Sequence, residues 1–409
     1  MTVSVQDIDA ARTRIRAHVR LTPLERSETL SRLTGADVWL KFENLQFTSS
    51  FKERGALNSL LRLGAAERER GVIAMSAGNH AQAVAYHGER LGVPVTIVMP
   101  ESTPNAKIAA TAVFGAEVLL RGRRFDETRS FTEVLAAERD LVLLHPFDDA
   151  SVIAGQGTLG LELLEQLERF DDLLVPVGGG GLLAGVSLAV RAARPATRIV
   201  GVQSEHFSAV ASAFGTGGTA QAGADTIAEG IAVKTPGERT LPILQANVDE
   251  MHTVSEAAIE RAVFTLLEVE KTVTEGAGAV GLAALFSAPE RFVGRRVVIV
   301  LSGGNIDMMV LSSLLQRGLV NSERFTRVSV EIPDLPGALG KLTQAVGAAG
   351  CNIVELNHQR AFGVSSARRT RIELALQLRG AGQLPEALAS LREAGYEPQV
   401  VNSDNVGQS

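Results

Sequence analysis

The chain has 409 residues, 45% of them hydrophobic, which is enough for two or three domains with sizeable cores. The formal net charge of −6, with acidic and basic residues interspersed, argues against nucleic acid as a partner and favours small-molecule chemistry. Cys351 is the only cysteine, which excludes an intrachain disulfide and favours a reducing, cytoplasmic compartment, and no apolar run is long enough to predict a membrane span.

The first predicted element is a helix near the N-terminus. Ser4 and Asp7 have the spacing of a capping box, and Ile8, Ala11 and Ile15 follow at helical intervals. The pattern therefore predicts an amphipathic helix ahead of the first candidate functional residue.

Lys52 is that residue, and it follows Ser50 and Phe51 at the predicted start of a second helix. Phe51 and Leu57 are expected to face a core, so Lys52 is expected at the rim of a buried region. Burial lowers the pKa of an amine and leaves a usable neutral nucleophile. The alternative is an ordinary solvated surface lysine.

From residue 41 to residue 320, short β-rich runs alternate with helical stretches, which is typical of parallel sheets in an α/β fold. The expected strands are 72–75, 95–99, 116–120 and 141–144 in a smaller subdomain at roughly 52–150, and 173–177, 199–203 and 297–301 in a larger one. Two such subdomains facing each other would place a ligand between them, outside the carboxyl ends of the strands.

The loop Ser76-Ala77-Gly78-Asn79-His80 follows the strand 72–75 and opens a helix that runs to Leu91. Free backbone N–H groups at a helix start suit a substrate carboxylate. His80 is interpreted as a structural histidine in preference to a general base. The alternative for the whole loop is an N-cap serine followed by a turn glycine.

The run Gly178-Gly179-Gly180-Gly181-Leu182 separates the strand 173–177 from the next helix. Backbone N–H groups and the helix dipole at such a point favour a phosphate. One alternative is a tight turn with close packing. Another is a loose dinucleotide fingerprint followed by an acid at Glu205, which would indicate a nicotinamide-dependent dehydrogenase but would explain neither Lys52 nor a later serine-glycine loop.

That later loop is Ser302-Gly303-Gly304-Asn305, which follows the last strand predicted in this region. An early lysine, a central phosphate loop and a late small polar residue are the order that a pyridoxal-phosphate enzyme needs. In this interpretation Lys52 binds the cofactor aldehyde, the glycine loop holds the phosphate and Ser302 meets the ring nitrogen.

The pattern changes after a polar linker at 321–326. Strands at 328–332, 352–359, 371–378 and 396–401, with helices at 338–349 and 383–394, give the ferredoxin-like order βαββαβ. We therefore expect a pyridoxal-phosphate region at 1–320 and a separate α+β domain at 327–402 without a candidate catalytic cluster.

With these motifs the chain resembles the fold-type-II pyridoxal-phosphate enzymes, and within them the threonine dehydratases (threonine ammonia-lyases). The matching segments are 41–46 with 50–56, 76–82, 178–182, 275–279 and 302–307. The segment Arg327 to Val401 resembles an ACT domain, a module that commonly binds amino acids.

The resemblance implies roles for the site residues. Lys52, next to Phe51, would carry the Schiff base and move the α-proton, Asn79 would meet the pyridoxal hydroxyl, and Ser302 the ring nitrogen. The expected reaction is the deamination of L-threonine to 2-oxobutanoate and ammonia, with L-serine as a second substrate. A serine dehydratase or racemase of the same fold is the alternative.

The chain also departs from the family pattern. Ser49 stands where relatives often have glycine. Serine racemases of this fold resemble Ser-Ser-Gly-Asn-His at the substrate loop, where this chain has Ala77. They also carry a divalent-metal acid where this chain has Gln203, so no metal site is expected.

The ACT resemblance implies control by an amino acid. The residues expected to line the effector pocket are Leu335, Gly337, Ala338, Leu339, Asn352 and Ile353. Modules of this kind pair side by side, so a homodimer or homotetramer is expected. Isoleucine or valine is the expected effector, because isoleucine is the end product of the pathway that 2-oxobutanoate enters. The alternative is a module that serves only assembly.

Overall fold

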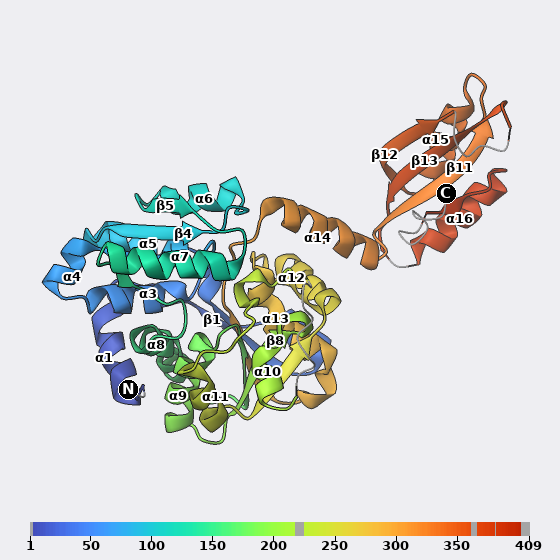
Figure 1. The fold of residues 1–409 in the computed structure, drawn as a ribbon. Helices are drawn as coiled ribbons and strands as arrows, with labels where there is room; N and C mark the ends of the chain where they lie inside the picture. Colours follow the sequence, from blue (N-terminus) through green and yellow to red (C-terminus); the bar gives the residue numbers. More distant parts are fainter. Residues whose placement is uncertain (1–2, 217–224, 361–365, 381, 402–409) are drawn as a thin grey trace. The chain divides into compact units, whose positions relative to one another are not determined.

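The computed structural model describes residues 3–216, 225–360, 366–380 and 382–401, and the chain divides into two compact units, Met1–Asp307 and Met308–Ser409 (Figure 1). The division falls earlier than the linker expected at 321–326. Helix α14 (Met308–Asn321) contacts strand β11 (Phe325–Pro333) and is therefore grouped with the second unit, and β11 begins within the expected linker.

The first unit contains two sheets. The larger has six strands in the order β1-β2-β10-β7-β8-β9, and the smaller has four in the order β5-β4-β3-β6. All neighbouring strands run parallel except β1 and β2. The strands are β1 (Leu24–Arg26), β2 (Asp37–Phe42), β3 (Val72–Met75), β4 (Val95–Met99), β5 (Glu117–Leu120), β6 (Val142–Leu143), β7 (Asp172–Pro176), β8 (Arg198–Ser204), β9 (Glu250–Val254) and β10 (Arg296–Leu301). This arrangement confirms the predicted two-domain parallel-sheet fold.

Helices cover both faces of the smaller sheet (Figure 1). Its helices are α3 (Lys52–Leu61), α4 (Ala65–Arg70), α5 (Asn79–Leu91), α6 (Asn105–Ala112) and α7 (Phe125–Glu138). Leu60 of α3 and Val84 of α5 share one core with Val72 and Ala74. On the opposite face Leu135 of α7 packs in the cluster of Ile73, as the alternation of side chains along a strand requires.

The larger sheet is also enclosed on both faces. Its helices are α1 (Val5–Ile15), α2 (Glu28–Thr34), α8 (Ala150–Gln166), α9 (Gly181–Ala193), α10 (Ala209–Ala213), α11 (Thr240–Asn247), α12 (Glu256–Glu270) and α13 (Gly276–Ser287), with short 3₁₀ turns η1 (Glu43–Leu45), η2 (Glu205–Phe207), η3 (Glu229–Ile231) and η4 (Pro289–Arg291). Helices α1, α8 and α9 bury their apolar side chains in the main core, and α13 packs closely on β10. The capping box of Ser4 and Asp7 is present at the start of α1.

The carboxyl ends of the parallel strands carry the predicted functional loops. In the register of the larger sheet Phe42 at the end of β2 pairs with Leu301 at the end of β10, directly before Ser302. The glycine loop follows β7, and the loop that starts at Ser76 follows β3. Ligands of open α/β sheets bind at this edge, so the fold brings these loops to the expected place.

The second unit forms a four-stranded antiparallel sheet in the order β12-β13-β11-β14. Its other elements are α15 (Ala338–Ala348), β12 (Asn352–Gln359), β13 (Arg369–Gln377), α16 (Gln383–Glu393) and β14 (Gln399–Val400). Val330, Leu342, Leu374 and Leu391 belong to its core. The order βαββαβ and this strand arrangement confirm the predicted ferredoxin-like domain.

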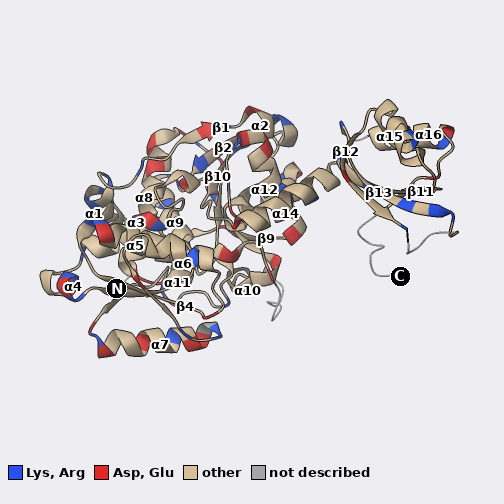
Figure 2. Ribbon diagram, turned by 90° about the horizontal axis from the view of Figure 1, so that it is seen from above, with Lys and Arg blue, Asp and Glu red and all other residues tan. Residues whose placement is uncertain are grey.

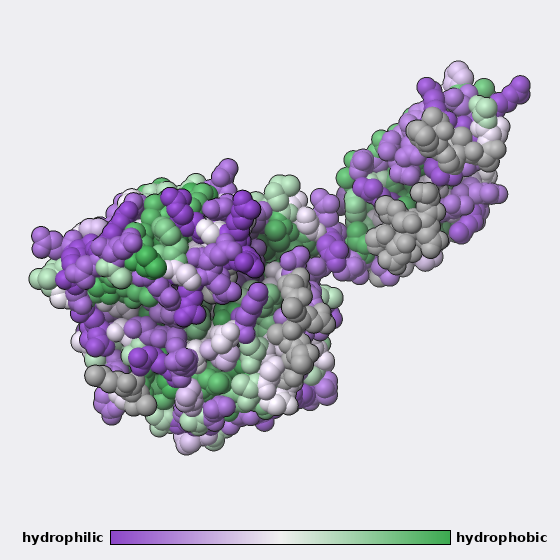
Figure 3. Space-filling model, viewed as in Figure 1, coloured by the Kyte–Doolittle hydropathy of each residue, from purple (hydrophilic) through white to green (hydrophobic). Residues whose placement is uncertain are grey.

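Charged residues of both signs are interspersed along the ribbon of each unit (Figure 2), and the visible face of the first unit carries hydrophobic residues between hydrophilic ones (Figure 3). Within the described ranges, no helix has the length and apolar character needed to cross a membrane.

Candidate active site

Lys52 occupies the first position of α3, and Phe51 is its N-cap residue. The preceding loop is joined to the serine-glycine loop after β10. Phe51 N donates to Ser302 O at 3.1 Å, Gly304 N donates to Ser49 O at 2.9 Å, and Ser50 and Gly303 form an antiparallel bridge. The structure thus brings together Lys52 and Ser302, which the sequence had placed in one site.

Ser49, which departs from the family pattern, has a left-handed backbone conformation with φ of 56°. This region favours glycine, because a Cβ there lies too close to the following carbonyl oxygen. Serine adopts this conformation here.

The Lys52 amine is partly buried and donates to the carbonyl oxygen of Pro146 at 2.8 Å. Burial lowers the pKa of Lys52 to about 8, while the Glu275 carboxylate acts in the opposite direction. A substantial fraction of the amine is therefore neutral near physiological pH, as a nucleophile or proton acceptor needs to be.

The glycine loop joins β7 to α9, and each glycine is required locally. A Cβ at Gly179 would lie 2.2 Å from the Phe147 ring, and a Cβ at Gly181 would lie 2.8 Å from the Phe147 carbonyl oxygen. Gly180 has φ of 99°, and a Cβ at Gly178 would lie 3.1 Å from Ile231. The close-packing interpretation therefore explains why these four positions are glycine.

The anion-site interpretation rests on the backbone donors of the same loop. The N–H groups of Gly181, Leu182 and Leu183 open α9 and have no acceptor among the residues that the structure describes. All three residues are buried. Buried N–H groups without acceptors are costly, and a phosphate at the helix start would satisfy them.

The substrate loop connects β3 to α5, whose first residue is Asn79. Ser76 Oγ accepts a hydrogen bond from Gly78 N at 3.2 Å. His80 Nε2 lies 3.0 Å from the Leu144 carbonyl oxygen, and burial lowers the pKa of His80 to about 3. The imidazole is therefore neutral and donates to Leu144, in line with a structural histidine.

Asn79 is connected to two residues for which the sequence suggested no role. Asn79 Nδ2 donates to Glu275 Oε1 at 2.7 Å, and Asn305 Nδ2 donates to Asn79 Oδ1 at 2.6 Å. Both belong to segments that resemble the family pattern, and that resemblance was the only signal for them. Burial raises the pKa of Glu275 to about 7.

Ser302 is 2% exposed, and its hydroxyl has no hydrogen-bond partner among the described residues. The residue is nearly enclosed and its hydroxyl makes no hydrogen bond to these residues, so the hydroxyl is available to pair with a ligand atom. With the unpaired N–H groups at α9 and the neutral amine of Lys52, the donor set fits pyridoxal phosphate. Lys52 would bind its aldehyde, the glycine loop its phosphate and Ser302 its ring nitrogen.

A buried ion network adjoins the lysine on α3. The Arg54 guanidinium donates to both carboxylate oxygens of Glu43 at 2.8 Å, and to those of Glu162 at 2.7 and 2.8 Å. Lys41 Nζ also donates to Glu162 at 2.7 Å. Glu43 follows β2 and Glu162 lies on α8, so the network links β2, α3 and α8 next to Lys52.

Gln203, at the position where serine racemases carry a metal ligand, is engaged elsewhere. Its side chain donates to Val177 O at 3.1 Å and accepts from Ala211 N at 2.8 Å. In the part of the chain that the structure describes, no group of three or more His, Cys, Asp or Glu side chains is arranged to hold a metal ion.

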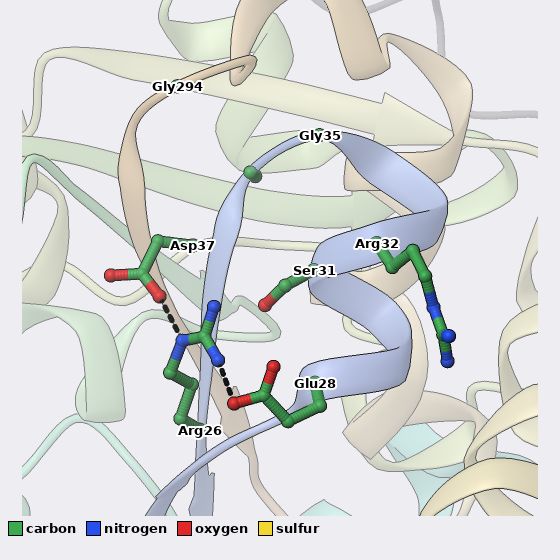
Figure 4. Close-up of a pocket in the computed structure, with 8 residues that line it drawn as sticks. Arg26, Glu28, Ser31, Arg32, Gly35, Asp37 and Gly294 are labelled. Atoms are coloured by element: carbon green, nitrogen blue, oxygen red, sulfur yellow. Dashed lines mark hydrogen bonds and ion pairs between the residues drawn. The ribbon is translucent and has the colours of Figure 1, made fainter.

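A separate pocket lies at the amino end of β2 (Figure 4). Arg26 Nε donates to Asp37 Oδ1 at 2.6 Å, and Arg26 also pairs with Glu28. Asp37 is the first residue of β2, at the edge of the sheet opposite Ser302. The pocket is therefore not part of the site around Lys52.

The comparisons with known proteins agree with this geometry. The family model described as pyridoxal-phosphate dependent enzyme matches residues 15–303. The chain belongs to this family. Its cofactor is pyridoxal 5'-phosphate.

The chain is 43% identical over 390 residues to an L-threonine ammonia-lyase of Geobacter sulfurreducens, covering 95% of this chain and 97% of that protein. Among solved structures it is similar to a threonine deaminase of T.th., with 42% identity and a TM-score of 0.71 over 75% of this chain and 99% of that one. It is also similar to maize serine racemase, with 31% identity and a TM-score of 0.72 over 79% of this chain and 100% of that one.

Proposed function

We propose that the protein deaminates L-threonine to 2-oxobutanoate and ammonia in the cytoplasm, with L-serine as a second substrate. The observation that carries the proposal is the identity of 43% to a protein named L-threonine ammonia-lyase along nearly the whole chain. The 42% identity to a threonine deaminase supports the same assignment.

In the proposed reaction the bound cofactor supplies an electron sink for the carbanion that forms at the substrate α-carbon. The neutral Lys52 amine accepts the α-proton at Nζ. The backbone N–H groups at the start of α9 hold the phosphate, and the Asn79 amide donates to the ring oxygen. A neutral serine hydroxyl at Ser302 does not keep the ring nitrogen protonated, which favours prompt loss of the β-hydroxyl.

The substrate carboxylate is proposed to bind at the loop Ser76 to Gly78 and the start of α5. Helix α5 runs from Asn79 to Leu91, so its first backbone N–H groups lack helical acceptors. The dipole of the helix favours a negative charge at the same point.

The direct test is the release of 2-oxobutanoate from L-threonine by the purified protein. L-serine is tested alongside, with pyruvate as its product. Steady turnover of threonine supports the proposal, and turnover of serine alone would replace it with a serine dehydratase.

The alternative function is a serine racemase, which the 31% identity to maize serine racemase keeps in view. Racemisation needs a second acid on the other face of the cofactor, and Ala77 has no titratable group. We expect D-serine to form far more slowly than pyruvate when L-serine is supplied. D-serine formed at a similar rate would overturn this, and Ala77→Ser should raise the side reaction.

We also propose that the second unit is an ACT-type regulatory domain that binds isoleucine or valine at a junction between paired subunits. Strand β12 is an edge strand with most of its residues exposed, which leaves it available for pairing.

The turn before α15 contains Gly337 with φ of 84°. Ala338 N already donates to Leu335 O at 3.2 Å, so the effector carboxylate would use the neighbouring N–H groups of Gly337 and Leu339. Asn352 and Ile353 begin β12 and would line the same pocket.

Titration of threonine turnover with isoleucine and valine tests this role. The full chain should respond, and a chain that ends at Asn321 should lose the response while keeping activity. A tenfold preference of the effector for the less active state corresponds to about 1.4 kcal/mol of coupling. Equal responses of both chains, or no response of the full chain, would leave the domain with an assembly role.

A further inference from the structure

The side-chain amide of Asn79 lies between two partners on different loops. Its Nδ2 donates to Glu275 Oε1 at 2.7 Å, and its Oδ1 accepts from Asn305 Nδ2 at 2.6 Å. Asn305 Nδ2 also donates to the Thr48 carbonyl oxygen at 2.8 Å. One of the two N–H groups of Asn79 has no partner among the described residues.

The direction of these hydrogen bonds is set at one end by a backbone carbonyl, which cannot reverse, and at the other end by the ionised form of Glu275. The Thr48 carbonyl can only accept, so the Asn305 side chain must present its nitrogen to it. The same nitrogen donates to Asn79, which places the Asn79 oxygen on that side. An ionised carboxylate at Glu275 also only accepts, so it requires the Asn79 nitrogen on the other side.

The Glu275 carboxyl has little room to turn away. A Cβ at Gly303 would lie 2.5 Å from Glu275 Oε1, and a Cβ at Gly230 would lie 3.0 Å from it. Glu275 N donates to Gly303 O at 3.1 Å, which ties the residue to the serine-glycine loop. The acceptor for Asn79 is therefore held by the backbone on both sides.

We propose that Asn305 and Glu275 are positioning residues that hold the Asn79 amide in one orientation and so keep one of its N–H groups available to the ring oxygen of pyridoxal phosphate. This inference rests on the role proposed above for Asn79. In the opposite orientation, the Asn79 carbonyl oxygen would face the cofactor ring oxygen in place of that N–H donor. Both oxygens are acceptors, so they would repel each other.

The test replaces a hydrogen-bond donor by an acceptor at Asn305, which begins the series of hydrogen bonds from Asn305 through Asn79 to Glu275. Asn305→Asp replaces the donor by a carboxylate of similar shape, which accepts only and favours the flipped Asn79 amide. Asn305→Ala removes the donor without adding a charge. Glu275→Gln keeps an acceptor oxygen for Asn79 and serves as the matched conservative variant.

The readouts are the absorption spectrum of the holoenzyme, its pH dependence and the half-time of cofactor loss during dialysis, with thermal unfolding measured in parallel. We expect Asn305→Asp to shift the cofactor band and shorten the half-time about tenfold, the loss typical of one charge-assisted hydrogen bond. Asn305→Ala should have a smaller effect, and Glu275→Gln should stay within about threefold of the native protein.

The two hypotheses fail in different ways. If Asn79→Ala changes neither the band nor cofactor retention, the role proposed for Asn79 is wrong. If Asn79→Ala changes both while Asn305→Asp leaves the band and the half-time as in the native protein, only the positioning role is wrong. A change in unfolding temperature without a change of the band also contradicts it, because a purely structural contact would not alter the spectrum.

Discussion

The two units of the chain differ in what they bury. The first unit buries Lys41, Glu43 and Arg54, all of them charged and fully buried. In the described residues of the second unit the buried polar side chains are uncharged, namely Ser329, Thr370 and Gln383. Buried ion pairs add little net stability, because desolvation offsets their attraction. Because Arg54 lies on α3 two positions after Lys52, the network ties that helix to Glu43 and to α8.

Some helical glycines of the two units also differ in their surroundings. A Cβ at Gly185 would lie 2.3 Å from Ile153 O, and a Cβ at Gly155 would lie 2.6 Å from Arg54 O, where α8 meets its neighbours. In the second unit, a Cβ at Gly340 or Gly347 would meet no atom within 4 Å. A side chain would therefore clash at Gly155 and Gly185, whereas Gly340 and Gly347 have room for one.

The largest effect should come from Lys52→Ala, which removes the amine proposed to bind the cofactor and to move the proton. Threonine turnover and the absorption band of the bound cofactor should both disappear. The control is Lys341→Ala, which removes an exposed lysine of the second unit and should leave turnover unchanged. Turnover and band retained in Lys52→Ala would refute the assignment.

The next largest effect should come from breaking the buried ion network around Arg54. Arg54→Met leaves Glu43 and Glu162 without their main partner, and losing one side of a buried pair costs about 3–5 kcal/mol of unfolding free energy. Arg371→Met in the second unit breaks a partly exposed pair with Glu331 at 3.2 Å, which should cost no more than about 1 kcal/mol. Denaturant titration of both variants measures their free energies of unfolding. Equal losses of unfolding free energy would show that the buried network is worth no more than the partly exposed pair.

A smaller contrast should separate two glycine substitutions. Gly179→Ala forces a methyl group into the Phe147 ring and should cost about 1–3 kcal/mol of stability while weakening cofactor retention. Gly347→Ala, in open space on α15, should raise stability by about 0.5–1 kcal/mol. Thermal unfolding and the cofactor band distinguish the two. A neutral Gly179→Ala would show that the loop can move away from Phe147.

The smallest effect is a dependence on pH. With a pKa of about 8 for Lys52, the neutral fraction of the amine rises with pH and levels off above that value. Incorporation of pyridoxal phosphate into cofactor-stripped protein should therefore be about tenfold slower at pH 7 than at pH 9, since each pH unit below the pKa is a factor of ten. The rate is followed by the absorption of the bound cofactor. A rate that keeps rising beyond pH 10 would indicate an ordinary exposed lysine.

Much of the fold was predictable, because β3, β4 and β10 are apolar runs bounded by turns. Strand β2 was missed because Asp37 and Lys41 interrupt its apolar pattern. Lys41 is tolerated in the core because its amine donates to Thr22 O and to Glu162 and Gln166 on α8, and the two α8 partners lie far along the chain. A local pattern cannot reveal a buried charge that is satisfied by such a distant residue.

The site shows the same limit. Lys52, the glycine loop and Ser302 stand out because each lies in a short motif with its own physical signal. Glu275 and Asn305 contribute through Asn79, and Glu275 is 196 positions from it. Their contribution depends on the direction of hydrogen bonds, which only the folded arrangement reveals.

The joining of residues 49–51 to residues 302–304 has a consequence for how the protein is made. Lys52 leaves the ribosome early in synthesis. The loop before it cannot form the bridge from Ser50 to Gly303, or the hydrogen bond from Phe51 N to Ser302 O, until β10 and the residues after it have also left the exit tunnel. Closing so long a loop is slow, because chain entropy is lost before the contacts form. The cofactor site is thus completed only at the end of the first unit's synthesis, before the second unit emerges.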